Sequence, residues 1–525
     1  MMESATPDQN KAYSWGHLAM AGFAGAGLAL AYPDYGLWPL AWLTLAPFLA
    51  SLWGKLPHQG ARLGFVFGIF YFGPTLTWLY NTMTNFGHMP AWLAVAANGL
   101  GVVYMSFFTA FFGWLVAWAG RRAGDEMALA FAPFFWVAVE LLRSHIPPLA
   151  FPWARIADSQ YLFIHFIQIA DICGEEGAGF IMLLANAALA ALILWAMGHR
   201  RRFPLGWVAV CAVLAPSIFL YGKASLARDY AAGAKPIPVA LIQGNIDQAR
   251  KWEHEYQREQ ARMYLAMTME ASAAGAKLAI WPETAATFYF GKDPYYDGLV
   301  REVASVSKLS LFFGAVDWGV VEGKEVAFNS AWLLTPDGEA QKYDKVRLAP
   351  FGEYVPLPRL LFFVHKIAHS IGDITPGEAP VNLDVGTYKI GPQICFEIIF
   401  PQYSAKLAAM GAGAIVNITN DSWFGFSPAS RQSLSMAVFR AVENRIPLLR
   451  GAQSGVSAII GPDGRISAET PLFVKTTLHG SFVPRQGPPT IYSLYCLPTA
   501  GFFVLASAGL LIWAYALGKR ARPED

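Results

Sequence analysis

The chain reads Gly391-Pro392-Gln393-Ile394-Cys395-Phe396-Glu397, so that a lone cysteine directly follows a short apolar segment. Two stretches upstream have the same form: an acid follows a predicted strand in Trp281-Pro282-Glu283, and a lysine does so in Tyr343-Asp344-Lys345. Cysteine attacks as a thiolate, and its free pKa of about 8.5 keeps it mostly protonated at neutral pH unless a base is near. The three stretches therefore predict a thiol nucleophile with an acid and a lysine as partners.

A structural interpretation of each residue stays open at this point. Taken singly, a cysteine such as Cys395 is more often a buried structural thiol, and residues such as Glu283 and Lys345 are more often surface charges. Spacing along the chain does not decide between the two interpretations, because loop lengths between strands vary freely.

Strands and helices alternate around these stretches. Strands are predicted at 239–243, 278–281, 309–316, 327–334, 341–346, 388–395 and 414–418, with two closing strands within 447–460. Helices are predicted at 251–274, 294–307, 401–410 and 428–444. Alternating strands and helices, mixed with hairpins, are typical of a layered α/β domain. The acid, the lysine and the cysteine would then lie at the ends of three different strands.

The rest of the chain has the composition of a membrane protein. Of its 525 residues, 55% are hydrophobic and 14% are charged, whereas soluble proteins carry about 25% charged residues. A membrane span needs about 20 mostly apolar residues. The stretch 147–176 is too polar to span and too apolar for a plain loop, so we expect it to lie in the membrane interface or to re-enter. Eight spans are predicted, at 14–32, 36–53, 63–81, 91–118, 127–146, 177–197, 204–221 and 497–517.

Basic residues predict the orientation, because Lys and Arg in short loops stay in the cytoplasm. The loops after the first and third spans contain neither residue. Residues 1–235 are thus expected to hold seven spans, 236–486 a domain that faces outward (in a bacterium, the periplasm), and 487–525 the eighth span with a basic cytoplasmic tail. Both termini would be cytoplasmic. The even-numbered spans are followed by Lys55, Arg62, Arg121, Arg122, Arg200, Arg201, Arg202, Lys519, Arg520 and Arg522.

Several other classes of function find no support. The net charge of +2 makes no case for nucleic-acid binding. The four cysteines, Cys173, Cys211, Cys395 and Cys496, show neither paired nor metal-ligand spacing, so neither a disulfide framework nor a metal is expected. The chain also has no glycine-rich phosphate loop, and no cofactor is expected. Eight spans and one domain are sufficient for a monomer.

Longer runs of sequence resemble known families. The three short stretches resemble the Glu-Lys-Cys triad motifs of the nitrilase (carbon–nitrogen hydrolase) superfamily. The runs Pro350-Phe351-Gly352-Glu353-Tyr354-Val355-Pro356 and Asn417-Ile418-Thr419-Asn420-Asp421-Ser422-Trp423-Phe424-Gly425 resemble the apolipoprotein N-acyltransferase family of bacterial membrane enzymes. So do Gln243-Gly244-Asn245 followed by Trp252, Phe151-Pro152-Trp153, and a domain between the seventh and eighth spans. The resemblance covers nearly the whole chain and implies a nitrilase-like αββα fold beside a polytopic helical membrane domain.

The resemblance also implies a role for each catalytic residue. Cys395 would be the nucleophile, Glu283 the general base, and Lys345 the stabiliser of the tetrahedral intermediate, helped by the N–H of Phe396. Supporting roles in the active site would fall to two further carboxylates: Glu353, which would hold the lysine or share proton transfer, and Glu397, which would orient the site.

Three tryptophans would contact lipid or lipopeptide: Trp252, Trp153 and Trp423. For Trp153, a place in the belt of interfacial aromatic residues is an equally good explanation. Phe396 stands where the family often has Tyr, so any role for a hydroxyl group is lost there while the backbone N–H stays.

The reaction implied is acyl transfer through a cysteine thioester. A phospholipid in the bilayer would be the acyl donor, and a diacylglyceryl-modified apolipoprotein would be the acceptor. A membrane-tethered amidase or nitrilase, with water as acceptor, is the nearest alternative. A transporter with a ligand-binding outer domain is a second one, but the predicted spans hold few charges, mainly Glu140. The segment around 360–380 has the composition to close as a lid.

Overall fold

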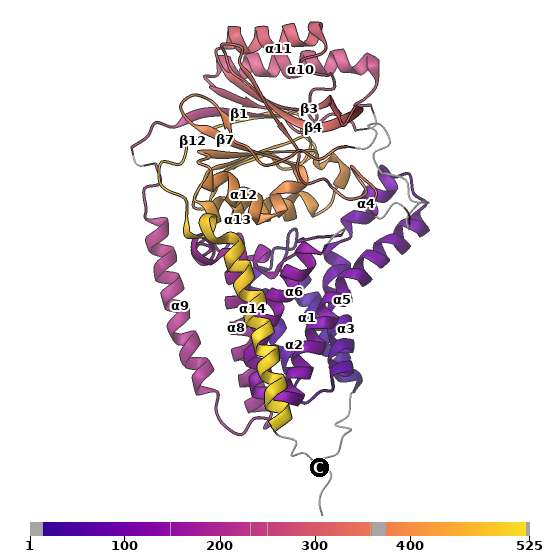
Figure 1. Ribbon diagram of the computed structural model, residues 1–525, viewed down its shortest axis with the longest axis vertical. Coiled ribbons are helices and arrows are strands. Elements are labelled where there is room, and N and C mark those ends of the chain that lie inside the picture. Colours follow the sequence, from indigo (N-terminus) through magenta and orange to yellow (C-terminus); the bar gives the residue numbers. More distant parts are fainter. Residues whose placement is uncertain are drawn as a thin grey trace, which may run out of the picture.

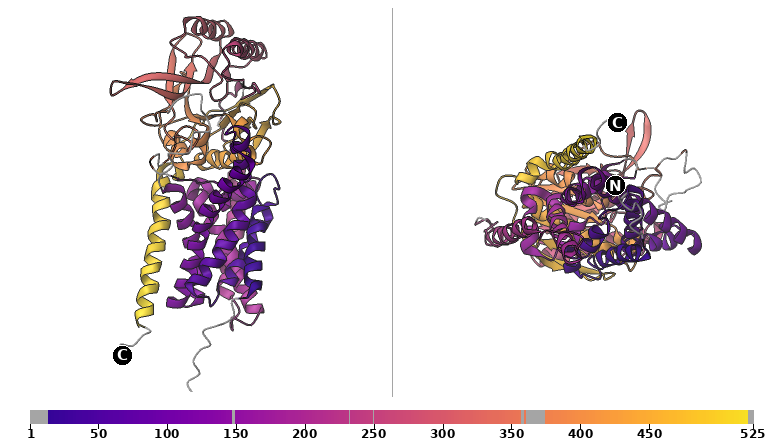
Figure 2. Two further views of the ribbon diagram at one scale, coloured as in Figure 1. Left: turned by 90° about the vertical axis from the view of Figure 1, so that its right-hand side faces the viewer. Right: turned by 90° about the horizontal axis from the view of Figure 1, so that it is seen from below.

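The computed structural model describes residues 14–520 apart from 147–148, 232, 249, 357–358 and 360–373. A block of helices stands beneath a layered α/β domain, and the last helix returns along the side of the block (Figures 1 and 2). Of the segment around 360–380, whose composition permits a lid, residues 360–373 lie outside the described residues.

Five of the described helices are long and apolar enough to cross a membrane. Two shorter helices bent by 53° to each other, α3 (Pro57–Thr75) and α4 (Trp78–Asn85), make a sixth span if they count as one. The protein is therefore a membrane protein, while the count of eight spans stays a prediction. The five long helices are α5 (Ala91–Ala123), α6 (Asp125–His145), α8 (Ala170–Ala196), α9 (Leu205–Leu226) and α14 (Ile491–Arg520).

The first two predicted spans are shorter than expected. The described part of the first is α1 (Trp15–Ala29). The second is divided into a 3₁₀ helix, η1 (Trp38–Trp42), and α2 (Leu45–Ser51). Pro39 and Pro47 each lie in the first turn of their helix, where the N–H that a proline lacks would have no partner within the helix.

The segment after α6 is buried between the helices and the layered domain. It contains η2 (Ile156–Gln160) and α7 (Ile164–Ile167). The N–H of Ile156 donates to Glu140 Oε1 over 3.0 Å, so the main carboxylate of the predicted spans anchors this segment.

Helix α14 ends far from the layered domain (Figure 1), and its last turn carries Lys519 and Arg520. Arg200 pairs with Glu126. The guanidinium carbon of Arg122 lies 5.5 Å from the ring centre of Tyr515 in α14. The loops that the sequence analysis assigned to the cytoplasm thus meet at one end of the block.

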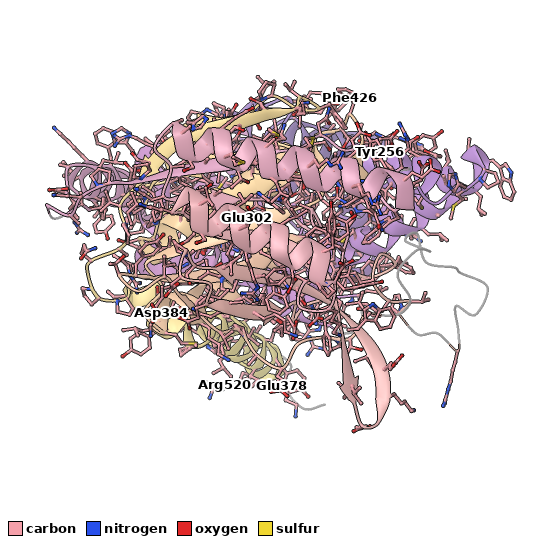
Figure 3. The ribbon with its side chains drawn as sticks, turned by 90° about the horizontal axis from the view of Figure 1, so that it is seen from above. Tyr256, Glu302, Glu378, Asp384, Phe426 and Arg520 are labelled. Carbon is pink, nitrogen blue, oxygen red and sulfur yellow. The ribbon has the colours of Figure 1, made fainter. Side chains whose placement is uncertain are left out.

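The domain has four layers, as the fold prediction required. One six-stranded sheet has the order β12-β1-β2-β3-β4-β5, and the other β11-β10-β9-β8-β7-β6. Helices α10 (His254–Ala273) and α11 (Pro294–Ser307) cover the first sheet, and Figure 3 shows both from above, carrying Tyr256 and Glu302. Helices α12 (Pro401–Ala409) and α13 (Ala429–Asn444) cover the second and face the helical block (Figure 1). The strands are β1 (Ile237–Gln243), β2 (Leu278–Ile280), β3 (Ser310–Val321), β4 (Lys324–Leu334), β5 (Ala340–Asp344), β6 (Leu383–Asp384), β7 (Lys389–Ile394), β8 (Ala414–Thr419), β9 (Leu448–Ala452), β10 (Ala458–Ile460), β11 (Ile466–Glu469) and β12 (Thr476–Phe482).

Apolar side chains from both sheets form the core between them, including Ile280, Phe312, Ile394 and Val416. Strands β7, β8 and β9 run parallel and are buried on both faces, which is why they appear in the sequence as continuous apolar runs. Strand β6 pairs only with the first two residues of β7, so no β6 residue lies opposite Pro392 to accept a hydrogen bond from its backbone. A proline, which has no N–H to donate, is therefore tolerated there.

Candidate active site

Three strand ends from the two sheets meet at one place. Strands β2 and β5 of the first sheet lead to Glu283 and Lys345, and β7 of the second leads to Cys395. The Lys345 ammonium lies 3.5 Å from Glu283 Oε1. The charges of Glu283 and Lys345 both act on the pKa of the Cys395 thiol. The structure therefore brings together the acid, the lysine and the cysteine that the sequence singled out.

The backbone at Cys395 is strained. Its φ of +50° lies in the left-handed region, which non-glycine residues seldom adopt and which is typical of functional sites. Burial raises the pKa of the thiol to about 12, and the Glu283 charge adds to this, while Lys345 and the Thr419 hydroxyl oppose it. The resting thiol is therefore protonated, so attack requires a base that takes its proton.

Glu283 is held rigidly beside the thiol. Its Oε1 accepts a hydrogen bond from Asn329 Nδ2 at 2.8 Å, and its Oε2 accepts one from the N–H of Asn420 at 2.9 Å. Strand β3 passes so close that a Cβ on Gly314 would lie 2.8 Å from the Glu283 Cα atom. The carboxylate thus has a fixed place, as a general base needs.

Lys345 is buried between two carboxylates. Its Nζ lies 2.8 Å from Glu353 Oε2, in addition to the contact with Glu283. Burial alone would lower the pKa of Lys345, but the negative charges of Glu353 and Glu283 outweigh it and raise the pKa well above its ordinary value. The side chain is therefore a permanent cation, as stabilisation of an oxyanion requires.

Glu397 joins the strand end that carries the lysine to the one that carries the cysteine. Its Oε1 accepts hydrogen bonds from the Tyr343 hydroxyl at 2.6 Å and from the N–H groups of Val346 and Arg347 at 2.7 and 3.0 Å. Its Oε2 accepts the N–H of Ile394 at 2.8 Å. This fully buried carboxylate fixes the distance between the two strand ends.

Asn329 in β4 is a residue that the sequence analysis missed. Its Nδ2 donates to Glu283 Oε1 and to Glu353 Oε1, both at 2.8 Å, and its carbonyl oxygen accepts the N–H of Lys345 at 2.9 Å. The amide thus holds two like-charged carboxylates on either side of one lysine. The only signal in the sequence is a polar pair, Asn329-Ser330, among the apolar residues of the predicted strand 327–334.

Replacing Asn329 with Ala is expected to lower the catalytic rate about 10- to 100-fold, because two hydrogen bonds to charged groups are lost. Steady-state rates in detergent micelles measure the effect. Asn382→Ala is the matched control, since the Asn382 amide donates only to the backbone of Leu407 and Met410. Equal activities of the two variants would contradict a role for Asn329 in the site.

Lys251 is a second residue that the sequence analysis missed. It is buried, and its ammonium donates to the Thr284 hydroxyl at 2.6 Å and to the Glu283 carbonyl oxygen at 3.3 Å. The loop that carries Trp252 is thereby tied to the turn that carries Glu283. Burial lowers the pKa of Lys251 to about 8, although the Glu283 charge opposes the shift.

This lowered pKa predicts a pH-dependent stability. Between pH 8 and 10.5 the unfolded chain holds a proton on Lys251 that the folded protein has lost. The unfolding free energy of the wild type should therefore rise with pH across this window, by up to about 3 kcal/mol relative to Lys251→Met. Denaturant unfolding of both proteins at several pH values measures the difference, and a constant difference would disprove the prediction.

The three predicted substrate-binding tryptophans lie in different surroundings. Trp252 is half-buried and packs with Tyr354 on a small cluster that includes Leu348. Trp153 is 2% exposed and donates its indole N–H to Gln432 Oε1 in α13 at 2.7 Å. Trp423 is half-buried in η4 (Asp421–Phe424), with its ring 5.1 Å from that of Phe86 beyond α4. Substrate contact stays a prediction for all three.

Comparisons with known proteins agree with this architecture. A model of the apolipoprotein N-acyltransferase N-terminal domain matches residues 24–188, and a carbon–nitrogen hydrolase model matches residues 238–483. The chain is 39% identical to the apolipoprotein N-acyltransferase of Geobacter metallireducens over 480 residues, 91% of each chain. It is 34% identical to that of Pseudomonas aeruginosa over 520 residues, 97% of each chain. With this identity across both the helical block and the layered domain, the chain belongs to the apolipoprotein N-acyltransferase family.

Proposed function

We propose that the protein transfers a fatty acyl chain from a membrane phospholipid to the α-amino group of the lipid-modified N-terminal cysteine of apolipoproteins. The convergence of Glu283, Lys345 and Cys395 above a block of apolar helices is the observation that carries the proposal. The names of the family members supply the reaction type and the acceptor.

The first half-reaction forms a thioester. Glu283 accepts the thiol proton as Cys395 attacks the ester carbonyl of the phospholipid. The Lys345 ammonium and the N–H of Phe396 stabilise the oxyanion that forms. When the intermediate collapses, the C–O bond to glycerol breaks and the leaving oxygen takes the proton from Glu283. The products are an acyl-enzyme and a lysophospholipid.

The second half-reaction passes the acyl chain to nitrogen. The neutral α-amine of the acceptor attacks the thioester carbonyl, and Glu283 accepts a proton from the amine. The C–S bond then breaks, and Glu283 returns the proton to the leaving thiolate of Cys395. An amide forms, and the enzyme is back in its starting state.

The helical block gives both substrates access from the bilayer. Extracting a lipid chain into water costs about 0.8 kcal/mol per methylene group, and an enzyme seated in the membrane avoids that cost. The basic residues at the far end of the helices support a cytoplasmic location for that end and a periplasmic one for the domain, in the bacterial inner membrane.

Supplying phospholipid with and without a diacylglyceryl lipopeptide tests the proposal. Acyl transfer requires the amine, so lysophospholipid should be released continuously only when lipopeptide is present. The N-acylated lipopeptide should appear in equal amount, as measured by mass spectrometry. Continuous release of free fatty acid without lipopeptide would instead indicate a membrane-tethered hydrolase.

A further inference from the structure

Arg347 is a cation whose backbone is bound within the candidate active site. It follows Lys345 by two residues, and its backbone N–H is held by Glu397 Oε1 at 3.0 Å. Its guanidinium carbon lies 5.0 Å from the ring centre of Phe400. Within the described part of the chain, the guanidinium makes no ion pair and no hydrogen bond.

Arg347 is half-buried, whereas three buried arginines of the domain are paired with carboxylates. The Nη2 atoms of Arg440, Arg445 and Arg450 lie 2.7, 2.9 and 3.0 Å from carboxylate oxygens. Arg347 differs from these structural arginines. Its guanidinium lies on an aromatic face, and its five N–H donors have no partner among the described residues. Such a planar fork suits a phosphate or a carboxylate that arrives with a ligand.

The surroundings of Arg347 connect it to the nucleophile and to the membrane block. The ring of Phe400 lies 5.2 Å from that of Phe396, the residue after Cys395. Phe396 in turn stacks at 6.4 Å on Phe151, in the buried segment above the helices. The guanidinium thus lies at one end of a line of aromatic rings that runs through Phe396, the residue after Cys395, to Phe151 in the segment after α6.

The two substrates of the proposed function differ in the group that this site would bind. A glycerophospholipid carries a phosphodiester on one terminal glycerol carbon and its acyl esters on the other two carbons. A diacylglyceryl-modified cysteine carries a thioether at that carbon and has no phosphate. A cation at this place therefore distinguishes the donor from the acceptor by charge.

We propose that Arg347 binds the phosphodiester of the acyl donor and so selects phospholipids in the first half-reaction. This inference rests on the proposed function. It assigns Arg347 no part in the second half-reaction, because the lysophospholipid has left by then.

Acyl-enzyme formation from two donors tests the inference in the full-length protein in detergent micelles. One donor is phosphatidylglycerol, and the other is a p-nitrophenyl ester of the same fatty acid, which is uncharged and activated. Arg347→Gln should lower the rate constant with phosphatidylglycerol about 10- to 100-fold, the range for a lost charge-assisted interaction. The rate with the nitrophenyl ester should stay within about twofold. Arg347→Lys should fall between the wild type and Arg347→Gln, because it keeps the charge and loses the fork.

Two controls accompany this comparison. Lys406→Gln removes the same charge from an exposed position on α12 and should leave both rates unchanged. Aminolysis of the preformed acyl-enzyme by lipopeptide should proceed at the same rate in Arg347→Gln and the wild type. Inorganic phosphate, at an ionic strength matched with chloride, distinguishes a general anion site from a site for the lipid phosphate.

Three results would overturn the inference. One is an equal loss with both donors, which would mean a structural role, and another is a loss confined to aminolysis. The third is that inorganic phosphate inhibits acyl-enzyme formation while Arg347→Gln leaves the ratio of the rates with the two donors unchanged. If the wild type itself formed no acyl-enzyme from phosphatidylglycerol, the proposed function would fail instead, so the two failures are distinguishable.

Discussion

Lys345→Met is expected to lower the rate of acyl-enzyme formation about 10³-fold, the cost of losing a preorganised oxyanion stabiliser. The ammonium lies 2.8 Å from Glu353 Oε2 and 3.5 Å from Glu283 Oε1, and these charges keep its pKa well above the ordinary value. No change of pH within the stable range of the protein would therefore reproduce the effect of the substitution. Single-turnover acylation with phospholipid measures it.

The same substitution should also destabilise the fold, because two buried carboxylates lose their shared cation. Breaking a buried ion pair costs about 3–5 kcal/mol. Lys342→Met is the matched control: Lys342 is partly exposed and pairs with Asp317 at 2.8 Å on the outer side of β5. Its acylation rate should stay within about twofold of the wild type, as for other surface ion pairs. Equal rates for the two variants would exclude Lys345 from the chemistry.

Glu397→Ala is expected to lower both activity and stability. The carboxylate accepts hydrogen bonds from three backbone N–H groups, at Ile394, Val346 and Arg347, and its loss leaves all three buried without an acceptor. Each unsatisfied buried donor costs about 1–3 kcal/mol. Displacing the lysine from the cysteine by about 1 Å is enough to lower a rate about 10²-fold.

Glu397→Gln tests whether the carboxylate positions the residues of the site or only stabilises the fold. The amide keeps one oxygen for the N–H groups of Val346 and Arg347 but presents an NH₂ group to the N–H of Ile394, so partial activity should return. Glu302→Ala, on the exposed face of α11 (Figure 3), is the control and should change neither quantity. If Glu397→Ala unfolds at a lower denaturant concentration than the wild type but keeps the wild-type acylation rate, the carboxylate only stabilises the fold.

The sequence pattern alone marked Glu283 and Cys395 only as polar residues that follow short apolar strands, and Lys345 follows a polar strand, β5. The roles predicted for all three came from the family resemblance of the motifs that contain them. Asn329 could not be found, because it lies within β4, where a polar residue is as consistent with a solvated face as with an active site. Lys251 could not, because burial of a lysine is decided by the packing of the loop around it.

Some elements of the fold could not be predicted from the sequence for similar physical reasons. Strand β6 has two residues, and β11 and β12 alternate or are exposed, so their apolar signal is weak. They form because a neighbouring strand offers a free edge: β12, for example, pairs along the whole of β1. The seating of the domain on the helices also depends on pairs distant in sequence, such as Arg440 with Glu175 and Arg445 with Asp171, which no local pattern reveals.

Mass spectrometry of the protein after incubation with phospholipid alone tests the central claim most directly. The account predicts that the peptide containing Cys395 gains the mass of one fatty acyl chain, that hydroxylamine removes it, and that lipopeptide discharges it to an amide. Cys395→Ser should show no hydroxylamine-labile thioester. An unmodified Cys395 peptide during turnover, or continued acylation of lipopeptide by Cys395→Ala, would contradict the account.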